Sequence, residues 1–219
     1  MASTGSGEQE RLAPTRERIR AVAEELYVLR GHEGFSFGDI AETIGTTRAN
    51  IHHHFGNKRR LMAELIEGFA SDAESRIAHH WTEETLSFSQ RLARQLEDLR
   101  HFYRRFNPAP GDRNVWSPIS RLRLDLPVLD RPAVEALERV NGAYVQYLEA
   151  ALAEAVRSGE LATATPVTEI ARILRVTLLS CPPMTQDSGS FGEIEQLFAA
   201  LDRMILGAWG GGTVAPRKR

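Results

Sequence analysis

The segment from Thr47 to His53 carries side chains that can hydrogen-bond to a nucleic acid. Ile51 and the following Phe55 can face inward, and Ala49 is small enough to let a helix sit deep in a groove. A recognition helix must be short, capped at its start and apolar only where it docks on its own domain. Five side chains are then left outside, each able to donate to a phosphate or a base edge: Thr47, Arg48, Asn50, His52 and His53.

The charge pattern around this segment favours phosphate binding. No acidic residue occurs between Glu42 and Glu64, whereas that window holds four cationic side chains and three histidines. The formal net charge of the chain is −2, which excludes a uniformly basic coat but not a local basic surface. Lys58 falls in the first turn of a predicted helix, where free backbone N–H groups also bind anions. The alternative for the run Lys58-Arg59-Arg60 is a solvated helix face.

A helix–turn–helix surrounds these residues. Ser36 with Asp39 forms a capping box that opens a helix, and Gly45 ends it. Thr47 can then cap a third short helix through His53, and Asn57 a fourth from Lys58 to about His80. A first helix carries the apolar stripe Ile19, Val22, Ala23, Leu26 and Leu29, closed by Gly31.

The rest of the chain also has helical periodicity, so we predict an all-α fold of about nine helices. We expect Ser87 with Gln90 to cap one helix, Asp130 the next long one and Ser190 with Glu193 the last. Between the helix capped by Asp130 and the last helix, a further helix opens at Thr165-Pro166. It should stop at Pro182-Pro183, because an interior proline removes a backbone hydrogen bond.

The 219 residues suffice for a large buried core, and 42% are hydrophobic. We expect a disordered tail at 1–12, a helix-turn-helix domain at 13–60, a helical bundle at 61–209 and a flexible tail at 210–219. No apolar run is long enough to span a membrane, and the N-terminus lacks the pattern of a secretory signal. A single cysteine, Cys181, favours a reducing compartment, so the expected location is the cytoplasm.

From Thr15 to Leu61 the chain resembles the N-terminal domain of the tetracycline-repressor (TetR) family. It departs from the family pattern at His54, where tyrosine is frequent, and at Gly56, where proline is common. The matching segments are Thr15–Ile19, Gly31–Ser36, Asp39–Ala41, Gly45, Thr47, Ile51–Phe55 and Asn57–Lys58. The resemblance implies that DNA contacts come from Thr46, Thr47, Arg48, Asn50, His52, His53 and Lys58.

The last two predicted helices, Val167 to Ser180 and Phe191 to Ala208, have broad apolar faces. Paired with a second copy they would form a four-helix homodimer interface, as the family resemblance implies. The alternative is an intramolecular core.

A ligand pocket is the second expectation for the C-terminal half. Aromatic walls with a few hydroxyl groups suit a small, partly apolar effector. The alternative is that these side chains only fill the core. The candidate lining residues are Leu99, Phe102, Tyr103, Phe106, Trp116, Tyr144, Tyr147 and Leu178.

Other classes of function find less support. His52, His53 and His54 are consecutive on a helix and point about 100° apart, so they cannot converge on one metal ion. No nucleophile–base–orienter set and no glycine-rich phosphate loop is recognisable, so we expect neither an enzyme nor a cofactor.

The sequence therefore predicts a ligand-responsive repressor that binds a palindromic operator as a dimer. The alternative is a helical protein–protein adaptor.

Overall fold

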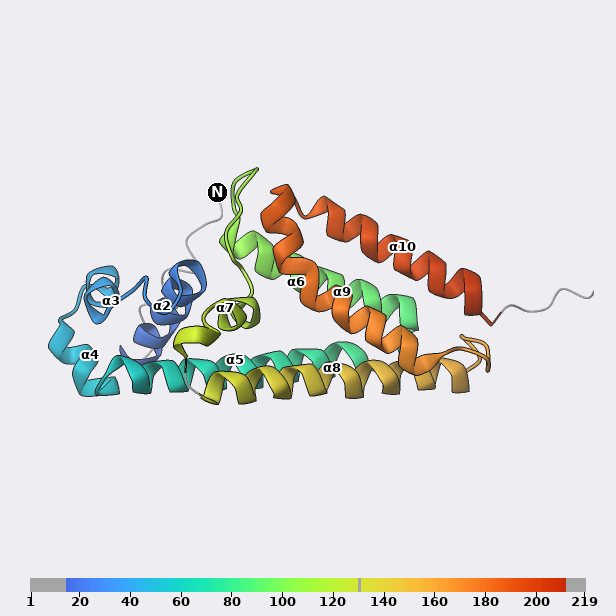
Figure 1. Ribbon diagram of the computed structural model, residues 1–219, viewed down its shortest axis with the longest axis horizontal. Helices are drawn as coiled ribbons and strands as arrows, with labels where there is room; N and C mark the ends of the chain where they lie inside the picture. The colour runs from blue at the N-terminus through green and yellow to red at the C-terminus, as the bar shows by residue number, and fades with distance from the viewer. Residues whose placement is uncertain (1–14, 130, 212–219) are drawn as a thin grey trace, which may run out of the picture. The chain divides into compact units, whose positions relative to one another are not determined.

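The computed structural model describes residues 15–129 and 131–211, which contain nine α-helices and one short 3-10 helix (Figure 1). The predicted all-α class is confirmed. The described residues form no strand, only an isolated bridge between Leu161 and Gly210. None of the described helices combines the length and apolar character that a transmembrane span needs.

The chain divides into two compact units. The first comprises residues 1–70 and 118–137, and the second comprises 71–117 and 138–219. The first unit thus contains the predicted helix-turn-helix segment and, in addition, a stretch from the middle of the chain. The predicted domain boundary at residue 60 stays a prediction.

The first unit is built on three N-terminal helices. These helices are α2 (Thr15–Arg30), α3 (Phe37–Ile44) and α4 (Arg48–Phe55). The start of α5 (Lys58–Trp81) follows, and the second stretch supplies α7 (Pro118–Leu124), η1 (Leu126–Val128) and the start of α8 (Arg131–Arg157). Ile19, Ile40, Ile51, Leu61 and Leu65 are fully buried and form the core of this unit.

Helix α7 caps the C-terminal end of α2. The Arg121 guanidinium donates from Nε to the Val28 carbonyl at 2.8 Å and from Nη2 to the Leu29 carbonyl at 3.0 Å. A carboxylate oxygen of Asp125 accepts a hydrogen bond from the His32 backbone N–H at 2.8 Å. The backbone between them turns at Gly31, whose φ of +76° favours glycine. The two bonds from Arg121 satisfy the Val28 and Leu29 carbonyls, which the end of a helix would otherwise leave without partners.

The second unit holds the rest of α5, α6 (Phe88–Phe106), most of α8, α9 (Val167–Ser188) and α10 (Gly192–Trp209). The predicted Ser87–Gln90 capping box is present at the start of α6. Trp81, Phe88, Trp116, Leu148 and Leu152 are among its largest fully buried side chains.

The predicted stop at Pro182-Pro183 is wrong, because α9 continues to Ser188. Proline fixes φ near its helical value, so it weakens a helix without being unable to lie in one. Here the continuation is anchored beyond the prolines. Thr185 Oγ1 donates to the Pro182 carbonyl at 2.8 Å and accepts from the Trp116 indole N–H at 2.7 Å, both buried.

Two smaller expectations also need correction. Leu29 is 36% exposed, and Tyr27 and Val28 are buried in its place. Helix α10 starts at Gly192 without a side-chain cap, and the Ser190 hydroxyl instead accepts from the Gly192 N–H at 3.1 Å.

At the end of the described chain the Gly211 N–H donates to the Glu160 carbonyl at 2.8 Å. The flexible tail expected at 210–219 stays a prediction. The predicted cap Asp130 and the tails at 1–12 and beyond Gly211 lie outside the described residues.

Candidate nucleic-acid interface

The turn between α3 and α4 has the geometry predicted from the sequence (Figure 1). The Ser36 side chain accepts from the Asp39 N–H, and the Asp39 carboxylate accepts from the Ser36 N–H at 2.8 Å. The hydrogen bonds from Ser36 hold the pKa of Asp39 below its usual value. Gly45 ends α3 with φ +69°, and the Thr46 N–H donates to the Ala41 carbonyl at 2.9 Å. A side chain at Gly45 would be strained in this conformation.

Helix α4 begins as expected at Thr47. The Thr47 hydroxyl accepts from the Asn50 N–H at 3.2 Å, which is the usual bond of an N-cap. Ile51 and Phe55 are the buried residues of this helix, with 0% and 3% exposure. The opposite face is polar and exposed. It includes Arg48, Ala49, His52 and His53.

Two of the polar side chains of α4 are held in place by neighbours. The Asn50 amide donates to the Thr46 hydroxyl at 3.0 Å. The His52 Nδ1 atom lies 2.8 Å from the Gly56 carbonyl, and its ring meets Phe37 edge to face at 4.8 Å. Such contacts reduce the conformational entropy that a side chain loses when it binds a partner.

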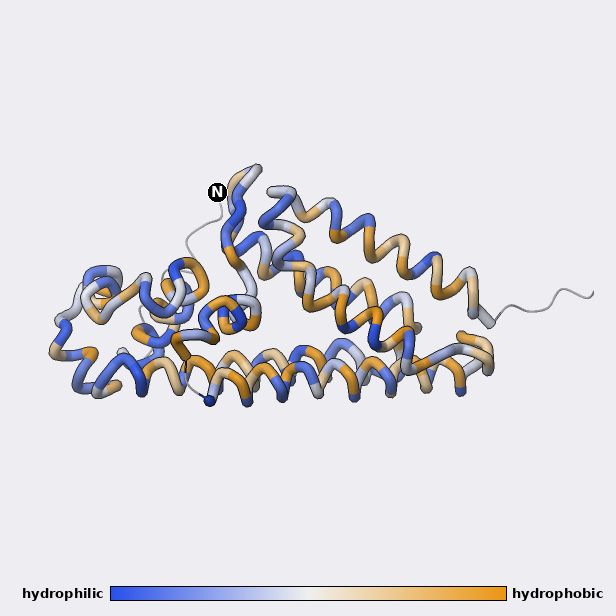
Figure 2. Tube along the Cα trace, in the orientation of Figure 1, coloured by the Kyte–Doolittle hydropathy of each residue, from blue (hydrophilic) through white to orange (hydrophobic). Residues whose placement is uncertain are grey.

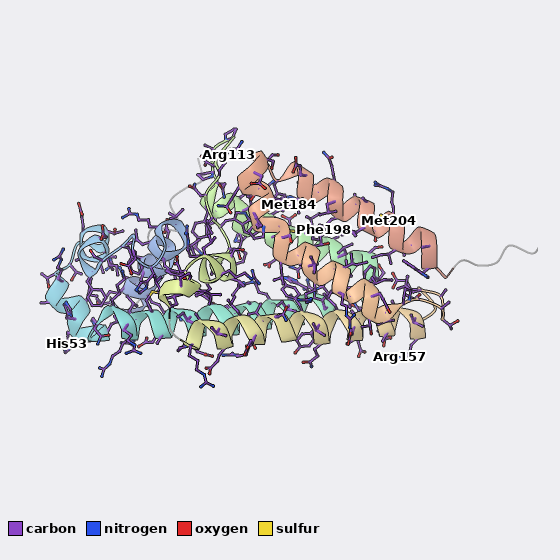
Figure 3. All side chains as sticks on the ribbon, viewed as in Figure 1. His53, Arg113, Arg157, Met184, Phe198 and Met204 are labelled. Atoms are coloured by element: carbon purple, nitrogen blue, oxygen red, sulfur yellow. The ribbon has the colours of Figure 1, made fainter. Side chains whose placement is uncertain are left out.

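His53 and Arg48 are the outward residues with the fewest constraints. The His53 ring contacts His54 at 5.5 Å and lies on the exposed side of α4 (Figure 3). Among the described residues, no hydrogen bond or ion pair holds the Arg48 guanidinium. It rests against Gly38 instead, where an added Cβ would approach Arg48 Nη2 to 2.3 Å. The glycine therefore leaves room for arginine beside α3.

Lys58 lies differently from what its sequence position suggests. Its ammonium group donates to the His32 and Phe35 carbonyls, the second at 2.6 Å, and lies 4.4 Å from the Phe35 ring centre. Burial lowers the pKa of Lys58, while the nearby carboxylates, Glu33 foremost, act in the opposite direction. Lys58 thus fastens the turn between α2 and α3, and one of its three N–H groups is left for another acceptor.

Arg16 is a residue of this region that the sequence analysis missed. Its guanidinium donates to the His54 carbonyl near the end of α4 and to the Glu64 carboxylate at 2.6 Å. It also lies 4.3 Å from the Phe55 ring centre. Arg16 thereby ties α2 to α4 and α5. Its partners are 38 and 48 residues away, so no local pattern could have revealed the contact.

The residues predicted to line a ligand pocket, six aromatic and two leucines, lie in the second unit. Six of the eight are buried: Leu99, Tyr103, Phe106, Trp116, Tyr144 and Leu178. Tyr103 packs edge-on against Trp116 at 6.2 Å and lies 5.3 Å from Phe191. Phe102 and Tyr147 are partly exposed, and the Arg76 guanidinium covers Phe102 at 4.5 Å. Their ligand-binding role stays a prediction.

Helices α9 and α10 carry exposed apolar side chains, and hydrophobic residues recur along both (Figure 2). Ile173 and Val176 on α9 are 56% and 55% exposed, and Met204 on α10 is 67% exposed (Figure 3). Leaving large apolar side chains in water is unfavourable, so these exposed side chains of α9 and α10 are suited to contact with another protein surface.

The described residues offer no metal centre, since no three potential ligands among His, Cys, Asp and Glu come together there. Cys181 is fully buried, and burial raises the pKa of its thiol to about 12. A thiol held in its protonated form is a poor nucleophile.

Comparison with known proteins bears directly on the helix-turn-helix. Residues 19–65 match the family model of bacterial regulatory proteins of the tetR family. Residues 19–65 thus form a helix-turn-helix domain of the TetR type.

The similarity to individual TetR-family regulators is concentrated in the N-terminal region. The chain is 37% identical over 59 residues to the transcriptional regulator TtgR of Pseudomonas putida, covering 27% of this chain and 28% of TtgR. It is 28% identical over 135 residues to the repressor AcnR of Corynebacterium diphtheriae, covering 58% and 66%. The match thus spans little more than a quarter of TtgR and just under two thirds of AcnR.

The fold is similar over nearly the whole chain. Reduced NemR of E. coli has a TM-score of 0.72 at 19% identity, covering 91% of this chain and 99% of NemR. A TetR regulator from Legionella pneumophila has a TM-score of 0.69 at 20% identity, covering 89% and 98%.

Proposed function

We propose that this TetR-family protein is a transcription regulator that inserts α4 into the major groove of an operator. The observation that carries the proposal is the division of α4 into two faces. Ile51 and Phe55 are buried, while Arg48 and His53 are exposed and, apart from the His53 contact with His54, bear no described contact that fixes them. A capped helix of this kind can present its side chains to base edges without disturbing its own core.

The proposed DNA contacts fall into groups according to the chemistry of the side chains. In this proposal Arg48, Asn50 and His53 would contact base edges or phosphates, and the hydrogen bond to Thr46 would orient Asn50. The Thr46 and Thr47 hydroxyls and His52 are suited to the sugar–phosphate backbone. Lys58 would contribute its third N–H to a phosphate while it continues to hold the α2–α3 turn.

We propose that the regulator acts as a homodimer through α9 and α10. The exposed Ile173, Val176 and Met204 support this, since pairing with a second copy would remove them from water. Two recognition helices in successive major grooves require centres about 34–36 Å apart and a pseudo-palindromic operator.

We further propose repression relieved by a small, partly apolar effector. AcnR is a repressor, which supports this direction of control. An effector that prefers a dimer of different spacing would lower operator affinity by linkage, by roughly 5–150-fold for ordinary coupling energies.

The test uses the full-length protein and a binding sequence selected from random duplex DNA. We expect a pseudo-palindromic consensus, and an affinity that falls steeply with salt because bound phosphates release counterions. Fluorescence anisotropy of the selected duplex against a scrambled duplex measures both effects. Binding without sequence preference or salt dependence would contradict DNA recognition.

A further inference from the structure

A cavity of about 290 Å³ lies within the first unit, away from the outer face of α4. Three parts of the unit form it: the turn after α2, the first turns of α5, and the segment from η1 to the start of α8. Its volume is near the lower end of the range for small-molecule sites, about 300–1,000 Å³. The size therefore fits a ligand of one ring or a short branched chain.

Part of the cavity lining is apolar. Met62 and Ile66, on successive turns of α5, are 3% and 5% exposed. Val128 and Leu129 also line the cavity, and Val128 remains 54% exposed. A ligand that covered these side chains would remove apolar surface from water, which favours binding.

Another part of the lining is cationic. Lys58 and Arg59 line the cavity at the N-terminal end of α5, and no acidic residue is among its described lining residues. Glu33, Asp39 and Asp125 act on the Lys58 charge from outside the lining. The Lys58 ammonium group donates two of its three N–H groups to the His32 and Phe35 carbonyls, and the third is left for another acceptor.

We propose that this cavity binds a small amphipathic acid, with its carboxylate at Lys58 and Arg59 and its apolar body against Met62, Ile66 and Val128. The site lies wholly within the unit that carries α4 and uses none of the predicted aromatic lining of the second unit.

The site also implies a regulatory effect, and this consequence alone rests on the proposed function. The acid and a DNA phosphate would compete for the third N–H of Lys58. Occupation of the cavity should therefore weaken operator binding.

The test needs no DNA. The four methionines of the full-length protein are labelled with ¹³C in their methyl groups and observed by NMR during titration with 3-phenylpropionate. We expect a saturable shift of the Met62 resonance, identified with Met62→Leu. Met184 and Met204, on α9 and α10, report on any binding in the second unit (Figure 3). An unchanged chemical shift of the Met62 methyl group throughout the titration would overturn the proposal.

Two comparisons isolate the charged contact. The neutral 3-phenylpropionamide, of nearly the same shape, should bind about tenfold more weakly, the loss expected for one charge-assisted hydrogen bond. Arg59→Gln should lose a similar factor toward the acid, whereas Arg60→Gln, on a neighbouring arginine that does not line the cavity, should not. Equal binding of acid and amide, or equal losses in both variants, would contradict the carboxylate site.

The final measurement is a titration of the same labelled protein with inorganic phosphate. We expect it to shift Met62 only weakly, because it cannot use the apolar part of the lining. A phosphate affinity equal to that of 3-phenylpropionate would show an anion site without an apolar component, and would overturn the amphipathic ligand.

Discussion

The outer face of α4 and the Tyr103–Trp116 pair both contain candidate site residues, yet they lie in opposite environments. Arg48 and His53 on α4 are exposed. Trp116 is 1% exposed, packs against Tyr103 and donates its indole N–H to Thr185. The first region has unused hydrogen-bonding capacity, whereas in the second the Trp116 indole N–H is satisfied internally.

The difference teaches how far residue type can predict a site. Polar residues on one face of a short helix have no role in the core, so their pattern predicts exposure. Aromatic residues bury well in any core, so their presence predicts burial before it predicts a ligand. The two regions should therefore respond to mutation in opposite ways.

The largest expected effect is on the Tyr103–Trp116 pair. Trp116→Ala should lower the free energy of unfolding by about 3–5 kcal/mol, because it leaves a cavity and removes the partner of Thr185. Urea unfolding followed by circular dichroism measures it. The control is Val145→Ala on α8, which is 37% exposed and should cost less than about 1 kcal/mol. Equal effects would show that Trp116 is not a core residue.

Arg48→Ala should have the converse effect. We expect operator affinity to fall by about 1–3 kcal/mol, because a base or phosphate contact is lost. The unfolding free energy should stay within about 0.5 kcal/mol of the parent, because the side chain is exposed. Arg157→Ala, an equally simple change at a 68% exposed arginine, is the control and should leave operator affinity unchanged. If Arg48→Ala lowered the unfolding free energy without lowering operator affinity, Arg48 would act in the fold and not in DNA binding.

Thr47→Ala tests whether the cap maintains the exposed face. Removing the hydroxyl that accepts the Asn50 N–H should destabilise the start of α4 by about 1 kcal/mol. Thr47→Ser retains an oxygen in the same place and should restore most of this loss. Denaturant unfolding of the two variants side by side provides the measurement, and indistinguishable midpoints would argue against a capping role.

The smallest effect concerns pH. The pKa of Asp39 is lowered in the folded protein, chiefly by its bonds with Ser36. The associated stability is present above the unfolded pKa, near 3.9, and is lost as the pH falls through the lower folded value. Asp39→Asn should flatten the decline of stability below about pH 4. Unfolding midpoints across this range, compared with those of the parent, check the expectation, and an unchanged slope would contradict it.

Local capping contacts could be predicted from the sequence. The Ser36–Asp39 and Ser87–Gln90 boxes, the Gly45 turn and the Thr47 cap are all present. Each of these contacts joins residues within about four positions of one another, so the spacing of residue types determines it.

Contacts between distant segments could not be predicted in this way. Arg121 reaches carbonyls more than 90 residues earlier in the chain, and Arg16 reaches the end of α4. The prolines of α9 failed as a stop signal for the same reason, since Trp116 anchors the helix from another part of the sequence. Lys58 was predicted in the right region, but its two carbonyl partners depend on how the α2–α3 turn folds.

The capping of α2 by α7 has a consequence for how the chain can be divided. Val28 and Leu29 receive their hydrogen bonds from Arg121, and the His32 N–H donates to Asp125. A fragment ending at Ala70 would lack both donor and acceptor, and water would have to replace them. The C-terminal end of α2 is thus completed by a stretch made much later on the ribosome, and its full stability should arise only after residue 125 has been synthesised.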